Sequence, residues 1–171
     1  MTRLAVAVWP PPEVVEVLEA LDRPVVAGVR WSTPEQWVVK VRPLGHVDEH
    51  VVLALVDALR DELRAAPATM CRLGPATRRI AQWLGAPVAG REDLAAVVFD
   101  ATEVLVPVTH PQPFEADIVL ARGHVPKELA GVPVAASWTA RSLSLVADRS
   151  APGVPRLEEL ARFPLAPISS R

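Results

Sequence analysis

The sequence predicts an α+β fold built from two similar halves. Short apolar or alternating segments, which are typical of strands, are interspersed with longer stretches whose apolar residues recur at helical spacing. Each half contains, in the same order, a strand, a helix and a strand with a distinctive motif. A chain of 171 residues suits one domain, or two small lobes that share a core. We therefore expect a single bilobal domain over residues 1–171, with lobes that are duplicated in the order of their elements and not in their residues.

Helices are indicated at three places by apolar residues that recur every three or four positions. The first follows the prolines at 10–12, because proline is tolerated in the first turn of a helix. The second begins after Asp48, whose side chain can cap free backbone amides, and the third begins near Glu92. The expected helices span approximately residues 12–21, 48–66 and 92–105.

Strands are indicated by short apolar runs and by alternation of apolar with polar side chains. The run at 4–9 ends at prolines, the segment 36–41 ends at Pro43, and the Gly74-Pro75 turn separates two later strands. The expected strands lie near residues 4–9, 29–32, 36–41, 69–73, 80–84, 114–122, 134–139 and 143–146, and the proline-rich tail ends in residues 160–165.

Several segments together carry a resemblance to a known family. Residues 29–45 read VRWSTPEQWVVKVRPLG, residues 114–122 read FEADIVLAR, and residues 153–165 read GVPRLEELARFPL. With the opening strand at 3–9, they resemble in order the two-histidine phosphoesterases, the 2′-5′ RNA ligase-like proteins. The first segment is similar to the tryptophan–proline turn and His-x-Thr strand of that family, and the second to its His-x-Thr-Leu-Ala-Arg region.

The resemblance implies both a fold and a chemistry. The implied fold is bilobal, with two antiparallel sheets that face a central cleft and helices outside. One His-x-Thr motif lies on each side of the cleft in that family, which acts on 2′,3′-cyclic phosphates or 2′-5′ phosphodiesters. One histidine accepts a proton from the nucleophile and the other protonates the leaving oxygen, while the threonine hydroxyls bind phosphate oxygens.

The catalytic residues of that family are replaced at the matching positions. Val38 and Lys40 stand in place of the first His-x-Thr pair, and Asp117 and Val119 in place of the second. Valine cannot transfer a proton, and each general acid or base contributes roughly 10²–10⁴-fold to the rate. The sequence therefore predicts a catalytically degenerate relative that binds a small anionic or nucleotide ligand, or a protein partner, in or near the cleft.

Two enzymatic alternatives stay open. In one, Asp117 is the base and Lys40 stabilises charge in a remodelled site. In the other, His110 substitutes for a lost histidine in a conventional RNA 2′,3′-cyclic phosphodiesterase. Lys40 and Asp117 are expected to project into the same cleft, where they form either an anion site or an ion pair that closes the cleft.

Three further side chains are candidates for ligand binding. Arg42 is expected on the same strand face as Lys40, and Arg122 follows the second motif, so either could hold a phosphate or carboxylate bidentately. Arg122 has the opposite strand parity from Asp117, which equally favours a structural salt bridge. Trp31 is expected at the mouth of the cleft, where it could stack on a ligand. The other four tryptophans are better explained as core residues.

Composition limits the remaining classes. The net charge of −2 gives no sign of an extended nucleic-acid surface, so RNA binding depends on a local basic patch. Cys71 is the single cysteine, and the residues around His46 and His50 are better explained by a helix start than by a metal site. We expect no metal and no cofactor. The sequence has no signal peptide or membrane-spanning run, which predicts a soluble, cytoplasmic protein.

Overall fold

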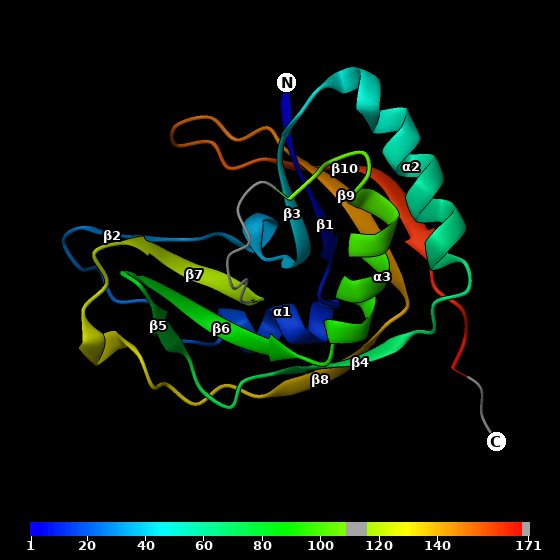
Figure 1. Cartoon of the computed structure of the whole chain (residues 1–171). Helices are drawn as coiled ribbons and strands as arrows, with labels where there is room; N and C mark the ends of the chain where they lie inside the picture. The colour runs from blue at the N-terminus through cyan, green and yellow to red at the C-terminus, as the bar shows by residue number, and fades with distance from the viewer. Residues whose placement is uncertain (109–115, 169–171) are drawn as a thin grey trace.

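The computed structural model describes residues 1–108 and 116–168 (Figure 1). Within these ranges the chain is a mixture of helices and strands, which confirms the predicted α+β class. The segment expected as one strand at 80–84 is divided between two strands that are joined by a tight turn, in which Ala81 has a φ of 52°. The elements are β1 (Thr2–Val8), α1 (Pro12–Glu19), β2 (Val29–Trp31), β3 (Val39–Val47), α2 (Glu49–Leu63), β4 (Thr69–Leu73), β5 (Arg78–Ile80), β6 (Trp83–Ala89), α3 (Glu92–Thr102), β7 (Asp117–Gly123), β8 (Ala136–Ala140), β9 (Ser142–Asp148) and β10 (Leu157–Pro164).

The strands form two antiparallel sheets, as the sequence predicted. The first sheet has four strands in the order β10-β9-β1-β3. The second has the order β2-β7-β6-β4-β8, and β5 also pairs with β6. The first strand of the chain is thus central in its sheet, between β3 from the first half and β9 from the second. This arrangement joins the two halves of the sequence in one sheet.

Each helix packs against a strand of one of the two sheets (Figure 1). Helices α2 and α3 pack together, α3 against β3 and α2 against β10, while α1 packs against β8 of the other sheet. The reason is visible in α2, where Leu55, Leu59 and Leu63 recur at four-residue spacing and are fully buried. No helix in the described ranges is long and apolar enough to cross a membrane.

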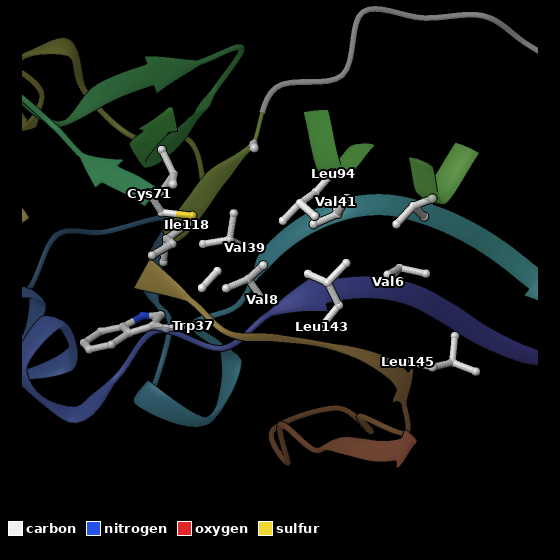
Figure 2. Packing of buried hydrophobic residues seen from close by; sticks show 14 of the residues in the cluster. Val6, Val8, Trp37, Val39, Val41, Cys71, Leu94, Ile118, Leu143 and Leu145 are labelled. Carbon is white, nitrogen blue, oxygen red and sulfur yellow. The ribbon is translucent and has the colours of Figure 1, made fainter. Parts of the chain in front are cut away.

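The main core fills the space between the sheets and their helices. On β1, Leu4, Val6 and Val8 belong to this core, because alternate side chains point to the same face of a strand. Figure 2 shows Val39 and Ile118 close together, so the core is continuous between β3 of one sheet and β7 of the other. The opposite faces of both sheets remain available for a site.

Candidate anion-binding cleft

A cleft of about 530 Å³ lies between the two sheets. The tip of the β9–β10 hairpin, residues 150–155, forms one of its walls. Its charged and aromatic lining comes from both sheets and includes Arg3, Arg30, Trp31, Lys40, Trp83, Arg122 and Asp148. The structure thus brings together three residues predicted from the sequence, namely Lys40, Arg122 and Trp31.

Lys40 reaches the cleft because it pairs with Ala7 of β1, on the sheet face that is opposite the main core. Burial lowers the pKa of the Lys40 ammonium group, and the charges of Arg3 and Arg122 lower it further. Asp148 acts in the other direction and raises it. A negative ligand would therefore relieve an unfavourable concentration of positive charge around Lys40.

Arg122 lies in the cleft because of an irregularity in the pairing of β7 with β6. Val119 is opposite Gly85 and Ala121 is opposite Leu84, so Leu120 is an extra residue between two paired positions. This bulge restores Arg122 to the cleft side, where it lines the same cavity as Val119. Regular alternation along the strand predicted that Arg122 and Asp117 point to opposite faces, and this prediction was wrong because of the bulge.

Contacts in the second sheet hold the Arg122 side chain in place. Its guanidinium carbon is 5.1 Å from the ring centroid of Trp83, and its Nη1 donates a 3.4 Å hydrogen bond to the Ser32 hydroxyl. Burial lowers the pKa of Arg122, Asp148 raises it, and Arg3 and Arg30 lower it again. Arg122 is thus fixed and charged, as a ligand for an anion should be.

Among the described residues, the cations of the cleft form no direct ion pair with a carboxylate. Arg3, Arg30, Lys40 and Arg122 have no acidic side chain within 4.0 Å in the part of the chain that the structure describes. Asp148 is the one carboxylate in the lining. Its burial raises its pKa, but hydrogen bonds from Ser150 and the charges of Arg3 and Lys40 produce a net lowering. Asp148 is therefore ionised and only partly offsets the positive charge.

Arg42 does not belong to the cleft, in contrast to the prediction. A second irregularity leaves Val41 as an extra residue, so that Arg42 pairs with Val6 on the core face of β1 while Lys40 pairs with Ala7 on the other face. The Arg42 guanidinium donates hydrogen bonds to the Thr102 hydroxyl and, over 2.6 Å, to the Val106 carbonyl oxygen. The role of Arg42 is to connect β3 with the end of α3.

Asp117 is bound by Arg78, an arginine from a different strand that no motif in the sequence indicates. Nε and Nη2 of Arg78 donate hydrogen bonds of 2.9 and 2.7 Å to the two carboxylate oxygens of Asp117. The Asp117 side chain is only 2% exposed, and it does not line the cleft. Gly85 provides the space, because a Cβ at that position would lie 2.9 Å from the Cβ of Asp117. The expected ion pair between Lys40 and Asp117 is therefore wrong.

The remaining motif positions carry no proton donor or acceptor. Val119 lines the cleft, and Val38 lines a smaller cavity that opens from it. Among the described residues that line either cavity there is no histidine; His46 and His124 are exposed on the surface. His110 lies outside the described residues.

Trp31 occupies the expected place at the cleft, and Trp83 is an addition that the sequence did not predict. The indole nitrogen of Trp31 donates a 2.9 Å hydrogen bond to the Pro24 carbonyl oxygen, which leaves its ring in the lining. Trp83 is 40% exposed although a core role was expected. Arg3 and Asp148 were also missed. They pair with each other near the ends of β1 and β9, whose remaining residues are almost continuously buried, so no alternation of polar and apolar side chains marked them.

Several solved structures share this fold, among them one described as a phosphoesterase, with a TM-score of 0.79 and 22% identity over 96% of this chain and 99% of that one. The structure of TT0787 from Thermus thermophilus has a TM-score of 0.83 and 23% identity, covering 95% of this chain and 97% of that one. E. coli LigT in complex with 3′-AMP has a TM-score of 0.80 and 22% identity, with coverages of 96% and 98%. The sequence matches no protein-family model and no curated protein. The similarity confirms the fold that was expected from the resemblance.

Proposed function

We propose that this protein binds a small anion in the cleft and does not catalyse the two-histidine phosphoesterase reaction. One observation carries the proposal: Arg3, Arg30, Lys40 and Arg122 line one cavity, and Asp148 is the single carboxylate among the described residues of its lining. A cluster of partly buried cations is electrostatically unfavourable unless a counterion neutralises it. The chain as a whole has a net charge of −2, so this positive region is local.

The nature of the similar proteins supports a phosphate-bearing ligand. LigT has been crystallised with 3′-AMP, ATP, NADP⁺ and phosphate. All four carry phosphate groups, and arginine binds such groups through two parallel hydrogen bonds. In this chain Arg122 offers a guanidinium group to the cleft, and Lys40 offers an ammonium group from the opposite sheet.

The arrangement of Asp117 argues against a rebuilt enzyme. A general base needs an oxygen within hydrogen-bonding distance of the substrate. Both oxygens of Asp117 accept hydrogen bonds from Arg78, and the side chain is almost fully buried. The open cleft also favours a ligand over a protein partner, since an ion pair between Lys40 and Asp117 would have filled it.

Binding can be tested by titrating inorganic phosphate and 3′-AMP into the protein in a calorimeter. We expect Lys40→Met to weaken binding by roughly 10- to 100-fold, which is the contribution of a hydrogen bond to a charged group. Lys127→Met is a matched control, because Lys127 is the other lysine of the chain and is exposed outside the cleft. Equal losses in both variants, or no binding of either anion, would contradict the proposal.

Catalysis can be tested with a short RNA that ends in a 2′,3′-cyclic phosphate. We expect the native chain to give no turnover above buffer, because no described side chain of the cleft can provide the paired acid and base. Turnover by the native chain that disappears in an Asp117→Ala variant shown by circular dichroism to be folded would instead identify a remodelled active site with Asp117 as its base.

A further inference from the structure

The charged cleft adjoins a second, mainly apolar cavity of about 110 Å³. The two cavities share Arg3, Lys40, Arg122 and Asp148 in their linings. A ligand whose anionic group is bound by these cations can therefore extend into the second cavity without leaving the protein. This geometry concerns the same site as the proposed function, and the inference rests on that function.

The walls of the apolar cavity come from a cluster that is separate from the main core. Ala7, Val38 and Val146 form this cluster, with Trp9 and Leu157 packed against it. Val38, which directly precedes β3, and Val146 of β9 line the cavity on the cleft side of the four-stranded sheet. Lys40 follows Val38 by two positions, so the apolar wall lies directly beside a cation.

The small side chains of the central strand create the space. Ala5 and Ala7 of β1 line the cavity, and Gly45 of β3 lines it without a side chain. Apolar cavities of about 150 Å³ are known to bind benzene. A cavity of about 110 Å³ thus accommodates a short alkyl chain and is too small for a purine base.

We propose that the cleft is specific for a phosphate monoester of a short alkyl chain. The phosphate contacts Lys40, Arg122 and Arg3, and the chain lies against Val38, Val146 and Leu157. Val38 is important because it provides apolar surface at a motif position, where a histidine would place a polar ring. The combination of a cation cluster and an adjoining apolar wall fits an amphipathic anion better than it fits inorganic phosphate.

The test is a calorimetric comparison of inorganic phosphate, ethyl phosphate, butyl phosphate and 3′-AMP as ligands of the native protein. We expect affinity to rise about fourfold for each methylene group that enters the cavity, which follows from the transfer free energy of a buried methylene. We also expect butyl phosphate to bind more tightly than 3′-AMP. Binding of phosphate without any gain from the alkyl chain, or a preference for 3′-AMP, would overturn the inference and leave the anion site intact.

A pair of matched variants tests whether the alkyl chain of the ligand lies in this cavity. Val38→Thr preserves shape and replaces one methyl group of the apolar wall by a hydroxyl group, and we expect it to reduce the ratio of butyl phosphate to phosphate affinity by fourfold or more. Val25→Thr makes the same change at a fully exposed position and should leave that ratio at the native value. Equal ratios in the two variants, with circular dichroism showing both folded, would place the alkyl chain elsewhere and overturn the inference. Failure of all these anions to bind would instead contradict the anion site itself.

Discussion

Asp117 and Arg78 form a bidentate ion pair across the neighbouring strand β6, with nitrogen–oxygen distances of 2.9 and 2.7 Å. The two partners differ in exposure, since the Asp117 side chain is 2% exposed and that of Arg78 is 45% exposed. A buried carboxylate depends on its hydrogen bonds more than a half-exposed guanidinium does. The aspartate at the second motif position is therefore a structural residue of the sheet.

We expect Asp117→Asn to lower the free energy of unfolding by about 1.5–3 kcal/mol, the typical contribution of hydrogen bonds to a charged group. In an Arg78→Met background the same substitution should have a much smaller effect, because the pair is already broken. Urea unfolding of the four proteins measures the coupling. Asp57→Asn, on the exposed side of α2, is a control for the loss of one carboxylate. The same loss in both Arg78 backgrounds would contradict a direct ion pair.

Arg42 and Arg122 should respond differently to the same substitution. Arg42→Met removes two hydrogen bonds to the end of α3 and the contact with the Phe99 ring, at 5.1 Å, so we expect a loss of about 2–4 kcal/mol in stability. Arg122→Met should instead weaken anion binding by tenfold or more, with a smaller effect on stability. Thermal unfolding and phosphate titration separate the two effects. If Arg42→Met lost anion binding and kept its stability, Arg42 would instead be a ligand-binding residue of the cleft.

Anion binding should weaken as the pH rises. The loss should begin at a pH below 10.5, which is the ordinary pKa of a lysine. The pKa of Lys40 is lowered by burial and by Arg3 and Arg122, and only the protonated form attracts an anion. Binding is therefore complete below the lowered pKa and is lost as the pH rises through it. Phosphate titrations between about pH 7.5 and 10.5 test this, and Lys40→Arg should retain binding over the whole range. A native profile that is flat and identical to that of Lys40→Arg would contradict the assignment.

The lowered pKa of Lys40 also affects the stability of the ligand-free protein, and here the effect of raising the pH is the opposite. Because the folded state releases the Lys40 proton at a lower pH than the unfolded state does, the unfolded state binds more protons between the two pKa values. The contribution of Lys40 to stability therefore rises as the pH increases through that window. Lys40→Met should remove this rise, whereas Lys127→Met should not.

Asp148→Asn should strengthen anion binding. Asp148 is the single carboxylate of the described cleft lining, and its charge lies close enough to Arg3 and Lys40 to alter pKa values. Without this carboxylate the anionic ligand is no longer repelled, and the positive charges of the cleft are no longer partly neutralised. We therefore expect the affinity for the anion to rise roughly two- to tenfold at low salt. Asp57→Asn makes the same change in total charge outside the cleft and should have little effect. Equal effects of the two variants would indicate a long-range influence of net charge alone.

The fold could be predicted because a resemblance to a known family, supported by the hydrophobic period of the segments, extends over nearly the whole chain in the same order. Prediction from the sequence failed for single residues wherever the strands depart from regular alternation. A bulge at Val41 turns Arg42 to the core, and one at Leu120 turns Arg122 to the cleft. Nothing in the local composition of either strand signals an extra residue, since bulges depend on the pairing partner.

The partner of Asp117 was also beyond prediction from local pattern. Arg78 is on a three-residue strand, and only the pairing of β5 and β7 on either side of β6 brings it to Asp117. Gly85 on β6 completes the arrangement by leaving room for the carboxylate. Three separate segments therefore determine one contact, and each of them taken alone is an ordinary strand.

The stacking of Arg122 on Trp83 gives the protein an intrinsic optical reporter. The chain has no tyrosine, so its near-ultraviolet emission comes from five tryptophans, of which Trp37 and Trp138 are buried and Trp83 is the most exposed. An anion that binds to the Arg122 guanidinium directly changes the surroundings of the Trp83 indole, because the two groups are in contact. Iodide quenching should then decrease when the cleft is occupied, which allows unlabelled compounds to be screened by fluorescence in solution.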